Sequence, residues 1–120
     1  MKIKTPAKLA PQTIYAAQNA RDGLIGVADL SLLTGVEAGV LSKFAKTGNM
    51  THYGEYHGKR FFNFQEIINW LHDNETTSEA KPVIWEKMTA LIQKKSVPYT
   101  LEKAIGKNVR IVWQDLVEAA

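Results

Sequence analysis

The sequence predicts a mainly α-helical fold that carries one small β-hairpin. Apolar residues recur at helical spacing within 24–50 and again within 83–95. Between the predicted helices, the stretch 51–62 is rich in aromatic residues and glycine, which is typical of a hairpin. The chain has 120 residues, 45% hydrophobic, and no cysteine, which fits one folded domain with an appendage and excludes disulfides and thiolate metal sites.

The first predicted element is a short helix behind a basic leader. Lysines stand at positions 2, 4 and 8. Pro11 opens an alanine-rich segment that Gly23 ends, so we expect a helix over 11–21. Residues 1–23 are therefore interpreted as a basic N-terminal arm with a short helix.

The next residues carry the pattern of two short helices joined by a sharp turn. Val27, Leu30 and Leu33 are three apart and predict one helix face. Gly35 follows, where a left-handed backbone is easily adopted only by glycine. A second helical apolar face begins at Leu41. This arrangement is typical of a helix-turn-helix, whose second helix presents its outer face to a DNA groove.

A hairpin and a third helix are expected to follow. The hairpin is predicted to turn around Gly58. Asn63 precedes a helical run and Glu66 comes three residues later, which indicates a capping box. The order helix, turn, helix, hairpin, helix predicts a winged helix-turn-helix over 24–72. The side chains expected in its core include Phe44, Phe62, Ile67, Trp70 and Leu71.

The C-terminal third begins with a predicted linker. Residues 73–82 are polar and acidic and end in proline, and 83–95 then show helical apolar spacing. We expect a short helix over 100–105. Residues 109–113 are rich in strand-forming residues, whereas Val112, Trp113, Leu116 and Val117 have helical spacing, and the pattern does not decide between a strand and a helix.

Two interpretations of residues 83–120 follow from this pattern. The segment 106–119 is loosely similar to 58–71, which suggests a degenerate second winged-helix unit. The alternative is a helical, basic and apolar dimerisation arm.

A family resemblance covers residues 24–71. The stretches LSLLTGVEAGVLSKFAKTGNM and HGKRFFNFQEIINWL resemble the winged helix domain of the excisionase and mercury-resistance-regulator type, which phage small terminase subunits share. The resemblance implies a DNA-binding protein of phage or mobile-element type, acting as a transcriptional regulator or as an excision (recombination directionality) factor. It also favours a homodimer, because two-fold DNA sites match two-fold proteins. The alternatives are a small terminase subunit that recognises packaging DNA, and a winged-helix protein-interaction module without DNA binding.

Double-stranded DNA is expected to contact the second helix, 37–47, and the hairpin. Glu37 can accept a hydrogen bond from cytosine, Ala38 can touch a thymine methyl group, and basic side chains suit phosphates. Tyr53 and Tyr56 are expected to pack within the hairpin. The candidate DNA-binding residues are Glu37, Ala38, Ser42, Lys43, Lys46, Thr47, His57, Lys59 and Arg60.

Charge and motif content narrow the function further. The net charge is +3, and the basic side chains gather in the flanks 1–23 and 81–110, which would add salt-dependent attraction to phosphates. The three histidines are scattered, and neither a glycine-rich phosphate loop nor a catalytic carboxylate pair is present. We therefore expect no enzyme activity, cofactor, metal or small-molecule substrate. With no signal peptide and no apolar run near roughly 18 residues, we expect a cytoplasmic protein that does not enter membranes.

Overall fold

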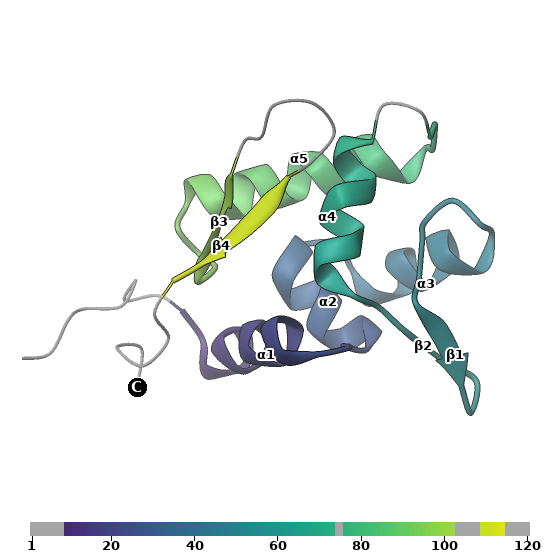
Figure 1. Ribbon diagram of the computed structural model, residues 1–120, viewed down its shortest axis with the longest axis horizontal. Coiled ribbons are helices and arrows are strands. Elements are labelled where there is room, and N and C mark those ends of the chain that lie inside the picture. Colours follow the sequence, from purple (N-terminus) through teal and green to yellow (C-terminus); the bar gives the residue numbers. More distant parts are fainter. Residues whose placement is uncertain (1–8, 74–75, 103–108, 115–120) are drawn as a thin grey trace, which may run out of the picture.

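The computed structural model describes residues 9–73, 76–102 and 109–114. The described chain is a mixed α/β fold, and the order helix, helix, hairpin, helix within it is compatible with a winged-helix-like arrangement (Figure 1). Its elements are α1 (Pro11–Asp22), α2 (Val27–Thr34), α3 (Ala38–Lys46), β1 (Gly54–Tyr56), β2 (Lys59–Phe61), α4 (Phe64–His72), α5 (Ala80–Gln93), β3 (Tyr99–Glu102) and β4 (Arg110–Trp113).

The predicted N-terminal helix is confirmed as α1. It begins at Pro11, whose missing N–H costs nothing in a first turn, and the Gly23 N–H closes it on the Asn19 carbonyl at 2.9 Å. Its alanine face is buried and packs against α2. The side-chain amide of Asn19 also donates to Asp29 on α2 at 3.2 Å.

The turn between α2 and α3 is built as the sequence predicts, with one addition. Gly35 has φ +79°, and its N–H donates to the Ser31 carbonyl at 2.9 Å. The addition is Thr34, whose buried hydroxyl donates to the Leu30 carbonyl at 2.8 Å and accepts the Val36 N–H at 3.2 Å. One buried hydroxyl therefore satisfies two backbone groups of the turn.

The hairpin β1–β2 is antiparallel and joined by a two-residue turn. Tyr56 pairs with Lys59, and the intervening His57 and Gly58 have φ +52° and +77°. Positive φ at both central residues identifies a type I′ turn, whose twist suits a hairpin. At the base of the hairpin, Phe62 exchanges backbone hydrogen bonds of 2.8 and 2.9 Å with the segment that leads into α2.

The cap of α4 is confirmed, and the expected core residues differ in how deeply they are buried; those that are partly buried still pack against the core. The Asn63 side chain accepts the Glu66 N–H at 3.0 Å, as half of a capping box requires. Phe62 and Ile67 are buried, whereas Phe44, Trp70 and Leu71 are only partly buried. Trp70 lies at the edge of the core, and the ammonium of Lys81 sits 5.3 Å from the centre of its ring. The fully buried side chains of α4 are those of Phe64, Ile67 and Ile68.

The helix α5 begins within the predicted linker. Pro82 lies in its first turn, where a missing N–H is tolerated. Before the helix, the Ser78 hydroxyl accepts the Ala80 N–H at 3.1 Å and donates to the Asn49 carbonyl, which links the start of α5 to the end of α3. Ile84 and Met88 belong to the same buried cluster as the side chains of α2 and α4.

The helix expected at 100–105 is wrong over its described residues, which form β3; residues 103–105 lie outside the described ranges. The ambiguous segment 109–113 contains the strand β4. Within the described residues, α5 is followed by a strand and not by a second helix, so no helix-turn-helix follows it there.

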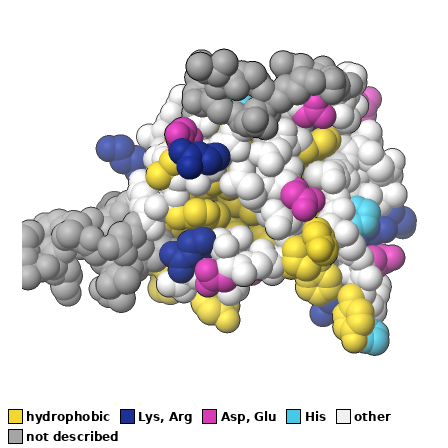
Figure 2. All heavy atoms as spheres, viewed as in Figure 1, with side chains coloured by type: hydrophobic (Ala, Val, Ile, Leu, Met, Phe, Trp, Pro, Cys, Tyr) yellow, Lys and Arg dark blue, Asp and Glu magenta, His cyan; other side chains and the backbone are white. Residues whose placement is uncertain are grey.

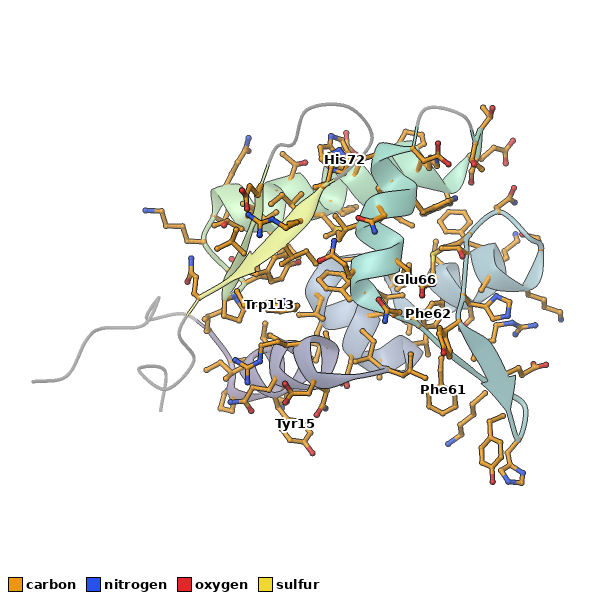
Figure 3. All side chains as sticks on the ribbon, in the orientation of Figure 1. Tyr15, Phe61, Phe62, Glu66, His72 and Trp113 are labelled. Carbon is orange, nitrogen blue, oxygen red and sulfur yellow. The ribbon has the colours of Figure 1, made fainter. Side chains whose placement is uncertain are left out.

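The second hairpin, β3–β4, is held onto α2 and α4 by an aromatic cluster. The Tyr99 ring lies 5.4 Å from Phe64 and 5.6 Å from Trp113, measured between ring centres. The Tyr99 hydroxyl donates to the carbonyl of Leu33 in the last turn of α2, where carbonyl groups lack helical partners. Burial raises the pKa of Tyr99 far above its usual value. In Figure 3, Trp113 lies between β4 and α1.

Gln65 on α4 holds the outer edge of β4. Its side-chain amide donates to the Val109 carbonyl at 2.9 Å and accepts the Ile111 N–H at 3.3 Å. The amide thus bonds two main-chain groups as a neighbouring strand would.

Candidate nucleic-acid interface

A hollow of about 370 Å³ lies where α2, α3 and the β1–β2 hairpin meet. Its walls come from the first turn of α2, from one residue of α3 and from the strand β2 with the glycine before it. Three of the candidate DNA-binding residues line it together: Ser42, Lys59 and Arg60. The hollow therefore brings candidate residues of α3 and of the β1–β2 hairpin together beside the N-terminus of α2.

The start of α2 supplies hydrogen-bond donors to this hollow. Gly26, Val27 and Ala28 line it, and no side chain caps the first turn. The free N–H groups and the positive end of the helix dipole favour an anion there. Asp29 also lies in this turn, and Asn19 donates a hydrogen bond to its carboxylate.

Arg60 is held in place by its cross-strand neighbour. Glu55 lies directly opposite in the sheet, and its carboxylate oxygen is 3.7 Å from Nη2 of Arg60. The Nε atom of Arg60 is buried and has no hydrogen-bond partner in the described chain. Lys59, by contrast, is exposed and makes no ion pair within the described residues. The hairpin thus carries one free cation and one that is partly neutralised.

The outer face of α3 differs in part from the expected one. Leu41 and Ala45 are buried, and Ala38 and Ser42 are half-buried, so Ala38 is not on the outer face. The residues of α3 and its two ends that are exposed are Glu37, Gly39, Val40, Lys43, Lys46 and Thr47. Gly39 and Val40 are exposed on this face although neither belongs to the candidate set, and Val40 lies between Glu37 and Lys43 where it could touch a thymine methyl group.

Thr47 has a structural use that the sequence did not reveal. Its hydroxyl donates to the Lys43 carbonyl at 2.9 Å and accepts from the Asn49 side-chain amide at 3.0 Å. It therefore satisfies a carbonyl at the C-terminal end of α3. Glu37 stands at the other end as the N-cap residue, and its side chain makes no capping hydrogen bond.

The hairpin exposes aromatic side chains, Tyr53 just before β1 and Tyr56 with His57 at the tip. The prediction that Tyr53 and Tyr56 pack within the hairpin is wrong, since they are 60% and 66% exposed. The ring of His57 lies 4.0 Å from that of Tyr56, edge to face. Figure 2 shows hydrophobic side chains beside a histidine where the hairpin projects from the body. The tip can therefore reach a partner with flat apolar rings as well as with Lys59.

Part of the basic C-terminal flank is already engaged within the protein. The Lys81 ammonium donates to the carbonyls of Asp73 and Thr76 at 2.7 and 2.6 Å. Arg110 forms a two-pronged ion pair with Glu102, with both N–O distances at 3.0 Å. These cations hold loops and strands together and have less capacity for phosphate than their number suggests.

Metal sites and membrane-spanning helices are absent from the described part of the chain. No group of three or more histidine, aspartate or glutamate side chains is placed there to hold a metal ion. None of its helices is both long and apolar enough to cross a membrane.

Comparison with known proteins gives no assignment. No family model matches the chain, and no curated protein or solved structure matches it either. The function is therefore inferred from the geometry of these residues.

Proposed function

We propose that this chain binds double-stranded DNA as a winged helix-turn-helix protein. The outer face of α3 would enter the major groove, and the β1–β2 hairpin would lie along the backbone or in the minor groove. The observation that carries the proposal is the hollow shared by α2, α3 and the hairpin, because it gathers Ser42, Lys59 and Arg60 beside the start of α2. A phosphate there would meet a hydroxyl, two cations and helix N–H groups.

The β1–β2 hairpin and the outer face of α3 would have different roles in DNA binding. Lys59 and Arg60 would contact phosphates, which adds affinity without sequence preference. On α3, Lys43 and Lys46 suit phosphate or guanine, and exposed Val40 suits a thymine methyl group. Recognition of sequence would thus depend on α3, and the salt dependence of binding on the hairpin.

The Glu55–Arg60 pair would tune this affinity. The Glu55 side chain is exposed, and its carboxylate oxygen lies 3.7 Å from the Arg60 guanidinium, so the ion pair contributes little to the stability of the fold. A phosphate would compete with Glu55 for the same guanidinium. Glu55→Gln should therefore tighten DNA binding, and Arg60→Ala should weaken it.

A protein-interaction module without DNA binding is the second candidate. It is favoured by the acidic groups on the proposed DNA surface, Glu37 at the start of α3 and Glu55 beside Arg60. Within the DNA-binding proposal, roles in transcription, excision and packaging differ in the DNA bound and in the assembly formed. A homodimer would fit a regulator or an excision factor, and a larger ring would fit a small terminase subunit.

Fluorescence anisotropy across a salt series tests the proposal. The variant pair Lys59→Ala and Arg60→Ala should lose affinity for duplex DNA, and the slope of log K against log salt should fall by about two. The matched control replaces Lys94 and Arg110, two exposed cations away from the hairpin, and should retain most of the affinity. Equal losses in both variants would refute a role for the hairpin. Absence of any binding at low salt would favour the protein-interaction module.

A further inference from the structure

A groove lies on the opposite side of the molecule from the proposed DNA surface, between α5 and β3. Its volume is about 260 Å³. One wall is a stripe of α5 formed by Trp85, Thr89, Ile92 and Gln93, and the other wall is β3. His72, at the end of α4 (Figure 3), also lines the groove, and its ring contacts that of Trp85.

The strand that forms this wall has an open edge. The Gln114 N–H donates to the Pro98 carbonyl at 3.1 Å, which makes Pro98 and Gln114 a hydrogen-bonded pair. In an antiparallel sheet, hydrogen-bonded and non-hydrogen-bonded residue pairs alternate along the strands. By this alternation Leu101 and Ile111, which lie opposite one another, do not bond to each other. The Ile111 N–H indeed donates outward to Gln65.

Leu101 is the corresponding residue on the other strand. Its N–H and C=O point away from β4, toward the edge that borders the groove. Neither group has a partner within the described residues. An unpaired strand edge of this kind is a template for another extended chain.

We propose that this groove binds an extended peptide segment of a partner protein, which joins β3 as an antiparallel third strand. One peptide residue would exchange both main-chain hydrogen bonds with Leu101. A neighbouring aromatic side chain would fill the hollow beside Trp85, which is 38% exposed. The Nε2 atom of His72 is buried without a hydrogen-bond partner in the described chain, and a phenolic hydroxyl would supply one.

The state of His72 agrees with a neutral partner at that position. Burial lowers the pKa of His72, which favours the uncharged imidazole. Its ring stands edge to face with Trp85, with 4.5 Å between ring centres. A neutral tyrosine side chain suits this pair of rings better than a charged one, because a buried charge would lack a counterion.

Charge complementarity indicates at which end of the peptide acidic residues are expected. Lys94 and Lys95 are exposed at the end of α5, next to the start of β3, and make no ion pair within the described residues. At the other end, Glu102 is already paired with Arg110. An antiparallel peptide directs its C-terminal half toward the two lysines. The preferred segment is therefore a tyrosine followed by apolar and then acidic residues.

The test uses the full chain, labelled with ¹⁵N, and an acetylated hexapeptide of threonine, tyrosine, threonine, valine, glutamate and glutamate. Titration should shift the Leu101 amide proton downfield and slow its exchange with solvent by at least tenfold at saturation. The same peptide with N-methylated central amides should bind at least tenfold more weakly. Replacing its glutamates by lysine should also weaken binding.

Protein variants make the test specific. Thr89→Phe fills the groove and should abolish binding, whereas Val83→Ala changes an exposed α5 residue outside the groove and should not. Replacing Lys94 and Lys95 by glutamate should reverse the preference toward the lysine peptide, which keeps the proposal testable if Thr89→Phe fails to fold.

Three results would overturn the proposal: an unshifted Leu101 amide, equal binding of the N-methylated peptide, or a Leu101 shift that grows with protein concentration alone. The last result would assign the strand edge to a second copy of this chain.

Discussion

Replacing Tyr99 with phenylalanine isolates the hydrogen bond that joins the second hairpin to the helix-turn-helix. The Tyr99 side chain is 1% exposed, and its hydroxyl donates to the carbonyl of fully buried Leu33. Phenylalanine keeps the ring contacts with Phe64 and Trp113 but leaves that carbonyl without a donor. A buried carbonyl left unsatisfied costs about 1–3 kcal/mol of unfolding free energy.

This loss should be visible in both thermal and chemical unfolding. For a chain of this length, roughly 4 °C of Tm per kcal/mol predicts a decrease of about 4–12 °C. The control is Tyr15→Phe, because Tyr15 is 64% exposed and points away from α1 into solvent (Figure 3). A change below about 0.5 kcal/mol in Tyr99→Phe would refute the view that this hydroxyl secures the end of α2.

The same pair of proteins gives a pH test with a defined sign. Burial raises the pKa of Tyr99 in the folded state, so above about pH 10 the unfolded chain releases a proton that the folded chain retains. Stability from the neutral phenol is thus complete below the unfolded pKa and declines as pH rises above it. The advantage of the wild type over Tyr99→Phe should shrink by about 1.4 kcal/mol per pH unit above that point. A constant difference from pH 8 to pH 11 would contradict the burial of this group.

Three further substitutions test the turns and edges of the fold. Gly35→Ala should destabilise by about 1–3 kcal/mol in urea unfolding, because φ is +79° and the added Cβ would lie 3.1 Å from Leu91. Lys95→Gly should stabilise by about 1 kcal/mol, since Lys95 has φ +56° at the end of α5, whereas Lys94→Gly, with φ −82° at the neighbouring position, should not stabilise. Gln65→Leu should cost about 1–3 kcal/mol and speed the hydrogen exchange of the β4 amide that this side chain holds; unchanged exchange would rule out that contact.

The parts of the fold that the sequence predicts are those set by short-range signals. Gly35 must adopt a left-handed backbone, Asn63 caps the helix that follows it, and the glycine at position 58 permits a tight hairpin turn. Each of these acts within a few residues. The same local pattern indicated the exposed lysines of α3.

The second hairpin could not be derived in this way because long-range contacts select it. The strand β3 has only four residues, with Tyr99 buried, Thr100 exposed and the next two half-buried, which is too short a pattern to separate a strand from a helix. The strand state is fixed by contacts with Gln65 and Leu33, which are distant in the sequence. Periodicity placed Trp70 on the core side of α4 but could not give its depth, which is partial, or the ammonium of Lys81 beside its ring.

In the candidate site, too, features set by neighbouring residues could be predicted, and features set by long-range pairing could not. The positions of Lys59 and Arg60 followed from the hairpin turn, but the cross-strand neighbour of Arg60 depends on the register, which pairs it with Glu55. The capping role of Thr47 likewise depends on where α3 ends.

The side-chain amide of Gln65 has a consequence for self-assembly. A two-stranded sheet with both edges free could add strands at either side and grow without limit, as in a fibril. Here the edge of β4 is occupied by Gln65, so within the described residues of this sheet the open edge is that of β3. A further copy that docked there through its own β3 edge would leave this sheet with no open edge among the described strands, and growth through it would stop at a closed pair. One glutamine thus converts an open polymerisation into a reaction that terminates after one addition, and its loss would restore the second growth point.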